Sequence, residues 1–186
     1  AVADDATAVY WNPAGLATGR PYGATVEWNR SQFGDLDRAP EVGVLRRKSA
    51  FSAFGTLPLG LSFGKLEEAE IVALSDGTLR VHSTEFRQYG VTILQTVVPG
   101  IVAGATVKYL RGSAVSSPAD ALVAGDALDA ALKSRRDSEG AVDVDLGLMA
   151  DFVKVRAGVV VKNLREPALG QIDGSAIRLR RHARLA

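Results

Sequence analysis

The amino-acid sequence predicts an all-β fold of antiparallel strands, because apolar and polar residues alternate along most of its 186 residues. A period of two is the pattern of a strand with one apolar face. Hydrophobic residues make up 47% of the chain and 19 residues are glycine. No apolar run reaches the roughly 18 residues that a membrane helix requires. Dispersal of apolar residues by alternation is typical of a transmembrane β-barrel.

A short helix is predicted at the N-terminus, before the first strand. Asp4 or Asp5 can cap it by accepting backbone N–H bonds, and residues 6–11 then form about a turn and a half. Pro13 is expected to end the helix, and Gly15 to permit a sharp reversal of the chain. We therefore expect a short helix, a tight turn and a polar exit.

Several windows alternate clearly enough to be predicted as strands. Residues 22–33 form the first, and the clearest are residues 101–111 and 142–152. In each of these last two, apolar residues share one face and small or polar residues share the other. Both have about the length that a tilted membrane strand requires, which is roughly 9–11 residues. Residues 155–163 are predicted to return antiparallel to the last of them.

The region from residue 42 to residue 97 is predicted to contain strands joined by tight turns. Residues 42–54 are expected to form one bent strand or two short ones, and Leu57-Pro58-Leu59-Gly60 a turn. Residues 65–74 are ambiguous, since Leu-Glu-Glu-Ala-Glu favours helix and Ile-Val favours strand. Asp76-Gly77 is a favoured hairpin pair, so we predict a long hairpin here, with a further strand over residues 85–97.

Residues 112–140 are predicted to form a long excursion with a helical loop. Ser117-Pro118 has the pattern of a helix start, and residues 119–133 are expected to be helical with a bend at Gly125. The last ten residues, 177–186, have the pattern of a strand still in progress. No signal peptide is visible at Ala1, so we expect the N-terminal portion of a longer barrel.

The run Ala-Val-Tyr-Trp-Asn-Pro-Ala-Gly-Leu over residues 8–16 resembles the N-terminal segment of the FadL/TodX-type outer-membrane transport proteins and their PorV-like relatives. The resemblance implies a plug segment over residues 1–20 and barrel strands over residues 21–186, with a helical loop at about 117–135. Looser matches cover residues 89–112 and 142–167. Full barrels of that family have about fourteen strands, within the range of such barrels, and we count only about eight.

The resemblance also implies a function. The protein would lie in the bacterial outer membrane, with the lipid bilayer and a hydrophobic small molecule such as a fatty acid as partners. The plug motif would be Asn12, Pro13, Ala14 and Gly15, with structural roles: Asn12 bridges plug and wall by hydrogen bonds, Pro13 stiffens the turn, and Gly15 lets it bend. PorV-like relatives instead act as partners in protein secretion.

Charge and composition argue against several other kinds of site. The chain has 22 basic and 21 acidic residues and no cysteine, so it has no general attraction for nucleic acid and no thiolate metal site. Two histidines 100 residues apart make a transition-metal site unexpected. Asp143 and Asp145 share a strand face and could bind Ca²⁺, but we expect them to face water in a lumen. We predict no cofactor.

Three alternative functions follow from other patterns. Residues 60–64 match the Gly-x-Ser-x-Gly elbow of hydrolases, which needs a helix after the serine and a base such as His82 or His182. Arginines over residues 178–184 could contact nucleic acid, but no aromatic residues that stack on bases lie near them; their alternation instead predicts one polar strand face. A soluble β-sandwich that acts as a binding module would show the same alternation. We predict no catalytic residue.

Overall fold

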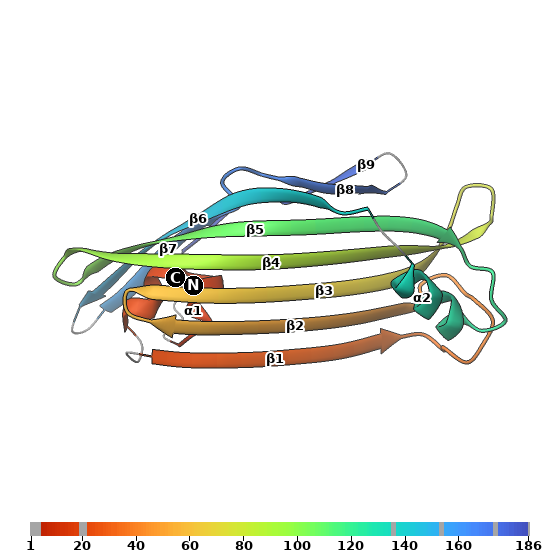
Figure 1. Cartoon of the computed structure of the whole chain (residues 1–186), viewed down its shortest axis with the longest axis horizontal. Helices are drawn as coiled ribbons and strands as arrows, with labels where there is room; N and C mark the ends of the chain where they lie inside the picture. Colours follow the sequence, from red (N-terminus) through yellow and green to blue (C-terminus); the bar gives the residue numbers. More distant parts are fainter. Residues whose placement is uncertain (1–4, 19–21, 135–136, 153–154, 173–174, 186) are drawn as a thin grey trace.

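The computed structural model describes residues 5–18, 22–134, 137–152, 155–172 and 175–185. Eight strands form one antiparallel sheet in which each strand lies beside its neighbour in the chain, apart from the last (Figure 1). In spatial order they are β1 (Tyr22–Phe33), β2 (Leu45–Thr56), β3 (Leu59–Ala73), β4 (Leu79–Val98), β5 (Ile101–Pro118), β6 (Glu139–Phe152), β7 (Val155–Lys162) and β10 (His182–Leu185). The all-β antiparallel prediction is confirmed. The sheet is open, because β1 pairs only with β2 and β10 only with β7.

The pairing register keeps residues of one kind in rows across the sheet. Leu61, Val91, Val107 and Val144 are successive partners on β3 to β6. The neighbouring positions Thr92, Thr106 and Asp145 form a second row on the opposite face. Since side chains alternate between faces along each strand, the sheet has one apolar and one polar face.

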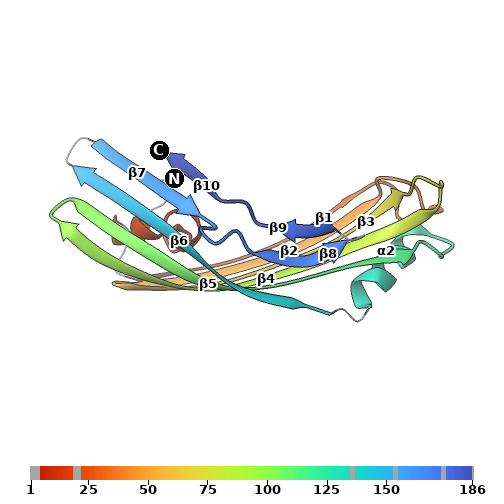
Figure 2. The same cartoon turned by 90° about the horizontal axis from the view of Figure 1, so that it is seen from above.

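The sheet is curved, and its two faces carry different elements (Figure 2). The N-terminal helical segment consists of α1 (Ala8–Trp11) and the 3₁₀ helix η1 (Pro13–Thr18) and lies on the concave, polar face. The hairpin of β8 (Ala168–Ile172) and β9 (Ser175–Arg178) covers the same face, where a side chain at Gly112 would meet Leu169. The helix α2 (Ala124–Lys133) packs on the convex face, at the other end of the strands.

The α2 region corrects one sequence-based prediction. Ser117-Pro118 does not start a helix: β5 continues to Pro118, which pairs with Arg80, and α2 begins at Ala124. Pro118 is the last residue of its strand, where the missing N–H costs the ladder little. Gly125 lies at the start of α2 and not at a bend within it. A buried apolar cluster joins α2 to β3 and β4: Val44, Ala69, Ile71, Val81, Ala124, Ala127, Leu128 and Ala131.

Strand pairing, which the sequence does not show, decides the structure of other segments. Residues 65–73, which favoured helix and strand equally, belong to β3, so the predicted long hairpin of β3 and β4 is confirmed. The prediction over residues 42–54 resolves as one strand, β2, which runs from Leu45 to Thr56. The continuous strand expected over residues 177–186 is wrong, because β9 ends at Arg178 and β10 begins at His182 in a different sheet. None of the helices in the described parts of the chain is both long and apolar enough to cross a membrane.

Candidate functional site

The N-terminal helical segment is shaped by Asp5 and Asn12. The Oδ1 atom of Asp5 accepts hydrogen bonds from the backbone N (2.8 Å) and the Oγ1 (2.5 Å) of Thr7, as a local turn does before a helix. The chain changes direction at Asn12, whose backbone is extended. The reversal predicted at Gly15 is wrong, because Gly15 lies inside η1. Pro13 does end α1, as predicted, but starts a second helix.

Asn12 joins the segment to the sheet. It is 0% exposed, and its Nδ2 donates to the backbone oxygen of Leu148 at 3.2 Å. Its Oδ1 accepts from the backbone N of Ala14 at 3.1 Å. The amide side chain thus bonds one backbone group of β6 and one of the N-terminal helical segment at the same time; that it joins a plug to a barrel wall, as the resemblance implied, stays a prediction. The bond to Ala14 is buried and the bond to Leu148 is partly buried, and an unpaired polar group there would be costly.

The part of the sheet beneath this motif carries two glycines that allow close approach. A Cβ on Gly147 would lie 2.0 Å from Oδ1 of Asn12, and a Cβ on Gly104 would lie 2.5 Å from the backbone N of Ala14. Real Cβ atoms do not come so close to other atoms. The Asn-Pro-Ala turn therefore fits against the sheet only because β5 and β6 carry glycine there. The alternation of residues 101–111 and 142–152 indicated an inner face of small residues, but not their contact with Asn12.

Apolar side chains anchor the other half of the segment. Val9 and Leu16 are buried and lie above Gly60 of β3, where a Cβ would approach each within 2.7 Å. They belong to a small cluster formed with the sheet, which consists of Ala6, Ala8, Val9, Leu16, Ala53 and Leu94. Burial of this size corresponds to only a few kcal/mol, so the segment is held by one small apolar cluster and a few polar bonds.

Two cations from β7 and β10, the last two strands of the sheet, contact the aromatic pair of α1. Lys162 of β7 donates Nζ to the backbone oxygen of Tyr10 at 2.9 Å, and the same atom lies 3.5 Å from the centre of the Tyr10 ring. The guanidinium carbon of Arg184 of β10 lies 5.8 Å from the Trp11 ring centre. Cation–π contacts of this kind contribute about 0.5–2 kcal/mol each. Sequence reasoning missed both contacts, since no local pattern links residues so far apart.

A buried ionic cluster lies on the same face, on β5 and β6. The Nζ of Lys108, which is 2% exposed, lies 2.6 Å from Asp145 Oδ1 and 3.0 Å from Asp143 Oδ2. It also donates to Asn163 Oδ1 at 2.9 Å. The backbone N atoms of Asn163 and Arg165 donate to the two carboxylates at 2.9 and 3.0 Å. Asp143 and Asp145 therefore do not face lumen water, and the Lys108 ammonium occupies the place that a Ca²⁺ ion would need.

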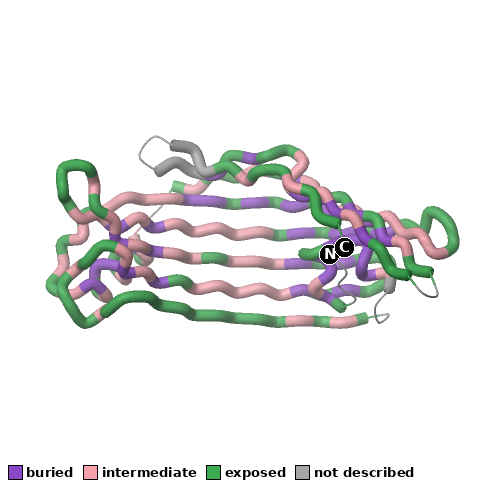
Figure 3. The backbone as a smooth tube through the Cα atoms, turned by 180° about the vertical axis from the view of Figure 1, so that it is seen from behind, coloured by how far each residue is buried: buried purple, intermediate pink, exposed green. Residues whose placement is uncertain are grey.

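Away from the N-terminal helical segment and α2, where buried residues gather (Figure 3), the convex face shows the opposite distribution of residues. Large apolar side chains point to solvent along β1 and β3 to β6, with Trp28 81% exposed. Those about half exposed include Leu61, Tyr89, Val91, Ile93, Val107, Tyr109, Leu146, Leu148 and Phe152. Three aromatic residues, Phe63, Tyr89 and Tyr109, are successive partners across β3, β4 and β5, with ring centres 5.2 and 6.5 Å apart.

The structure contradicts the geometry that a hydrolase elbow requires. Ser62 lies in the middle of β3, and the residues after it continue the strand and form no helix. Its partner on β4 is Gly90, eight residues from His82, which is about 26 Å along a strand. Among the residues that the structure describes, no group of three or more His, Cys, Asp or Glu side chains could hold a metal ion. Arg178 and Arg184 lie on different strands, so the single polar strand face predicted there is wrong.

Comparisons with protein-family models, curated proteins and solved structures give no match for this chain.

Proposed function

We propose that this chain forms part of the wall of a bacterial outer-membrane β-barrel that takes up hydrophobic small molecules such as fatty acids. The observation that carries the proposal is the inverted distribution of residues: ions and amides are buried on the concave face, and leucine, valine and aromatic side chains are exposed on the convex face. Water-soluble proteins rarely expose apolar patches of this extent. A barrel in lipid requires them.

The height of the exposed apolar face supports this proposal. On β6 it runs from Val142 to Phe152, which is about 33 Å along the strand. A strand tilt of about 40° reduces this to roughly 25 Å, the height of the apolar band of known membrane barrels. Phe152 closes one end of the band and the Phe63–Tyr89–Tyr109 row borders the other. Aromatic side chains at both borders match the girdles of such barrels.

The connections between strands suggest which end faces the outside. Leu57 and Pro58 join β2 to β3, and Pro99 and Gly100 join β4 to β5, at one end of the sheet. At the other end, residues 34–44 join β1 to β2, and the connection between β5 and β6 contains α2. Outer-membrane barrels have short periplasmic turns and long external loops. The α2 end would therefore be external.

The soluble β-sandwich is less well supported. A sandwich buries the apolar faces of two sheets against each other. In the described part of this chain, the second sheet is the β8–β9 hairpin, and it lies over the concave polar face, leaving the apolar face uncovered. The sandwich reading would need that face to be buried.

A wall of this kind must be closed by further strands. The outer edges of β1 and β10 present unpaired backbone groups, which are costly in lipid, and only closure removes them. In our proposal, other strands complete the barrel between these edges and the N-terminal helical segment acts as its plug. Movement of the segment away from Gly104 and Gly147 would open a path along the inner wall for an apolar ligand.

Two experiments test this proposal in turn. Vesicle flotation tests the membrane location: we expect the protein to float with lipid and to need detergent for a monodisperse solution. A protein that is monodisperse in buffer without detergent would contradict it. Uptake of a long-chain fatty acid or an alkylbenzene by proteoliposomes then tests transport, with empty vesicles as the control. Uptake no faster than in empty vesicles would count against transport and leave the location intact.

A further inference from the structure

A row of basic residues lies directly beyond the aromatic row on the convex face. Lys65, Arg87 and Arg111 are successive partners on β3, β4 and β5. Each comes two residues from its aromatic neighbour in the Phe63–Tyr89–Tyr109 row, so it points to the same side, about 7 Å further along the strand. From the centre of the band outward, the convex face is therefore apolar, then aromatic, then basic.

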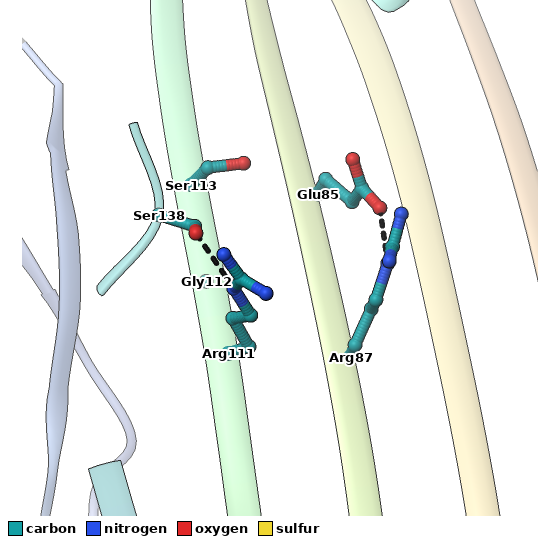
Figure 4. A pocket seen from close by; sticks show the side chains of 6 residues that line it. All are labelled: Glu85, Arg87, Arg111, Gly112, Ser113 and Ser138. Atoms are coloured by element: carbon teal, nitrogen blue, oxygen red, sulfur yellow. Dashed lines mark hydrogen bonds and ion pairs between the residues drawn. The ribbon is translucent and has the colours of Figure 1, made fainter. Parts of the chain in front are cut away.

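Arg87 and Arg111 line a shallow pocket together with Glu85, Gly112, Ser113 and Ser138. Figure 4 shows the Arg111 guanidinium between β5 and β4, near the side chains of Ser113 and Ser138, and the Arg87 guanidinium on the other side of β4, beside Glu85. Arg111 donates Nε to Ser138 Oγ at 2.6 Å. Guanidinium and hydroxyl donors that line one pocket suit the oxygens of a phosphate group.

The acidic residues of the next row do not cancel this charge. Glu85 accepts from Arg87 at 2.5 Å and lies 3.9 Å from Lys65. Glu67 pairs with Lys65 at 2.8 Å. Among the residues that the structure describes, no carboxylate pairs with Arg111. Two carboxylates thus face three cations, and the surplus positive charge lies on the β5 side of the pocket.

The surface beside Arg111 is continuous with the apolar band. Its partner on β6 is Gly140, which has no side chain, and the Tyr109 hydroxyl lies over that glycine. Val107 and Val142, both about half exposed, continue the same surface toward the centre of the band. An acyl chain on Val107 and Val142 would bring its headgroup to the level of Arg111.

We infer that Arg87 and Arg111 bind the phosphate group of a lipid in the leaflet at the α2 end of the barrel. The inference rests on the proposed membrane location, because it needs the aromatic row to lie at the border of the bilayer. A lipid is favoured over free phosphate, since the pocket is continuous with an exposed apolar surface on which acyl chains can lie. Ser138 and Ser113 would supply further hydrogen bonds to the same phosphate.

The test is lipid retention by the detergent-solubilised full chain, measured by native mass spectrometry. Phosphatidylglycerol is compared with diacylglycerol of the same acyl chains, which lacks the phosphate. The variant is Arg87→Gln/Arg111→Gln. The matched control is Arg47→Gln, which removes an arginine of β2 that is paired with Glu68 on the concave face. Arg111→Gln alone is a second variant, since its only loss within the protein is the bond to Ser138.

We expect the native chain and Arg47→Gln to retain phosphatidylglycerol and not diacylglycerol. Loss of two charge-assisted bonds should weaken retention in the double variant by about tenfold or more, and Arg111→Gln should fall between. Equal retention by all four proteins would overturn the inference, as would displacement of the lipid by millimolar inorganic phosphate. All proteins are first tested for flotation with vesicles. A native chain that does not float overturns the membrane location as well, whereas floating proteins with equal retention overturn only the lipid site.

Discussion

At the scale of single residues, the contact between the N-terminal helical segment and the sheet depends on two strand positions without a Cβ atom. Gly104 and Gly147 leave room for the Asn12-Pro13-Ala14 turn, so Asn12 can reach the backbone of β6. The family resemblance implied a bridging role for Asn12, and its amide does donate one hydrogen bond and accept another. Sequence alone could not identify the two glycines as the seat of Asn12, since they lie about 90 and 135 residues away and are two of many strand glycines.

The substitution Gly147→Ala tests this seat. The new Cβ would lie 2.0 Å from Asn12 Oδ1, so the segment must shift, at a cost of about 1–3 kcal/mol. We expect faster proteolysis of the segment and a change in Trp11 fluorescence. Gly64→Ala is the matched control, because its Cβ would come no nearer than 3.9 Å to any neighbour. If both variants behave like the native protein, the close packing described here is wrong.

Lys108 is the second residue whose removal should be severe. Lys108→Met removes the ammonium that contacts the buried Asp143 and Asp145, and breaking a buried pair in this way costs about 3–5 kcal/mol. We expect the loss in the free energy of unfolding, measured with denaturant in detergent micelles. The triple variant with Asp143→Asn and Asp145→Asn should recover most of it, because no buried carboxylate is then left without the Lys108 ammonium. A loss no larger than that of Lys133→Met, at an exposed position of α2, would contradict the burial of the cluster.

At the scale of elements, α2 is attached to the sheet by one apolar cluster and one ion pair. Arg46 of β2 pairs with Asp129 of α2. The hydrogen bond from Arg46 holds the pKa of the Asp129 carboxyl below its usual value. A carboxyl whose pKa is lowered by folding contributes stability above its unfolded pKa, about 3.9, and loses it as the pH falls through the folded value.

The docking of α2 should therefore weaken only in acid. Hydrogen exchange of the α2 amides is expected to be constant from about pH 8 to pH 5, after correction for the intrinsic rate, and to rise below about pH 4. Asp129→Asn should raise exchange at neutral pH and remove this acid dependence. Asp120→Asn, at an exposed position in the loop before α2, is the control and should behave like the native chain. Acid dependence that survives Asp129→Asn would show that another group is responsible.

Elements were predictable from sequence where local pattern and pairing agree. The strands at residues 101–111 and 142–152 alternate without a break, and β5 and β6 contain them. The start of α2 was misplaced because Ser117-Pro118 satisfies local capping rules, while the ladder from β4 holds those residues in β5. The C-terminal alternation was read as one strand because sequence does not show that β9 and β10 join different sheets.

At the scale of the whole molecule, the proposed function requires the convex face of the sheet to meet lipid. The register brings apolar residues of β3 to β6 into continuous rows on the convex face, while the concave face carries buried ions and the N-terminal helical segment. A two-faced sheet was predictable from alternation. Which face other elements cover was not predictable, because it depends on contacts between distant parts of the chain.

The most direct test of this account is the environment of single spin labels on the two kinds of exposed apolar residue. The chain has no cysteine, so Val107→Cys on the convex face and Leu122→Cys in the loop before α2 each give one labelling site. Leu122 is 93% exposed and Val107 is 51% exposed, so both labels are accessible. In vesicles, we expect the label at residue 107 to collide with oxygen and not with a water-soluble nickel chelate, and the label at residue 122 to collide readily with the chelate. Equal access of the nickel chelate to both positions would contradict a lipid-facing wall.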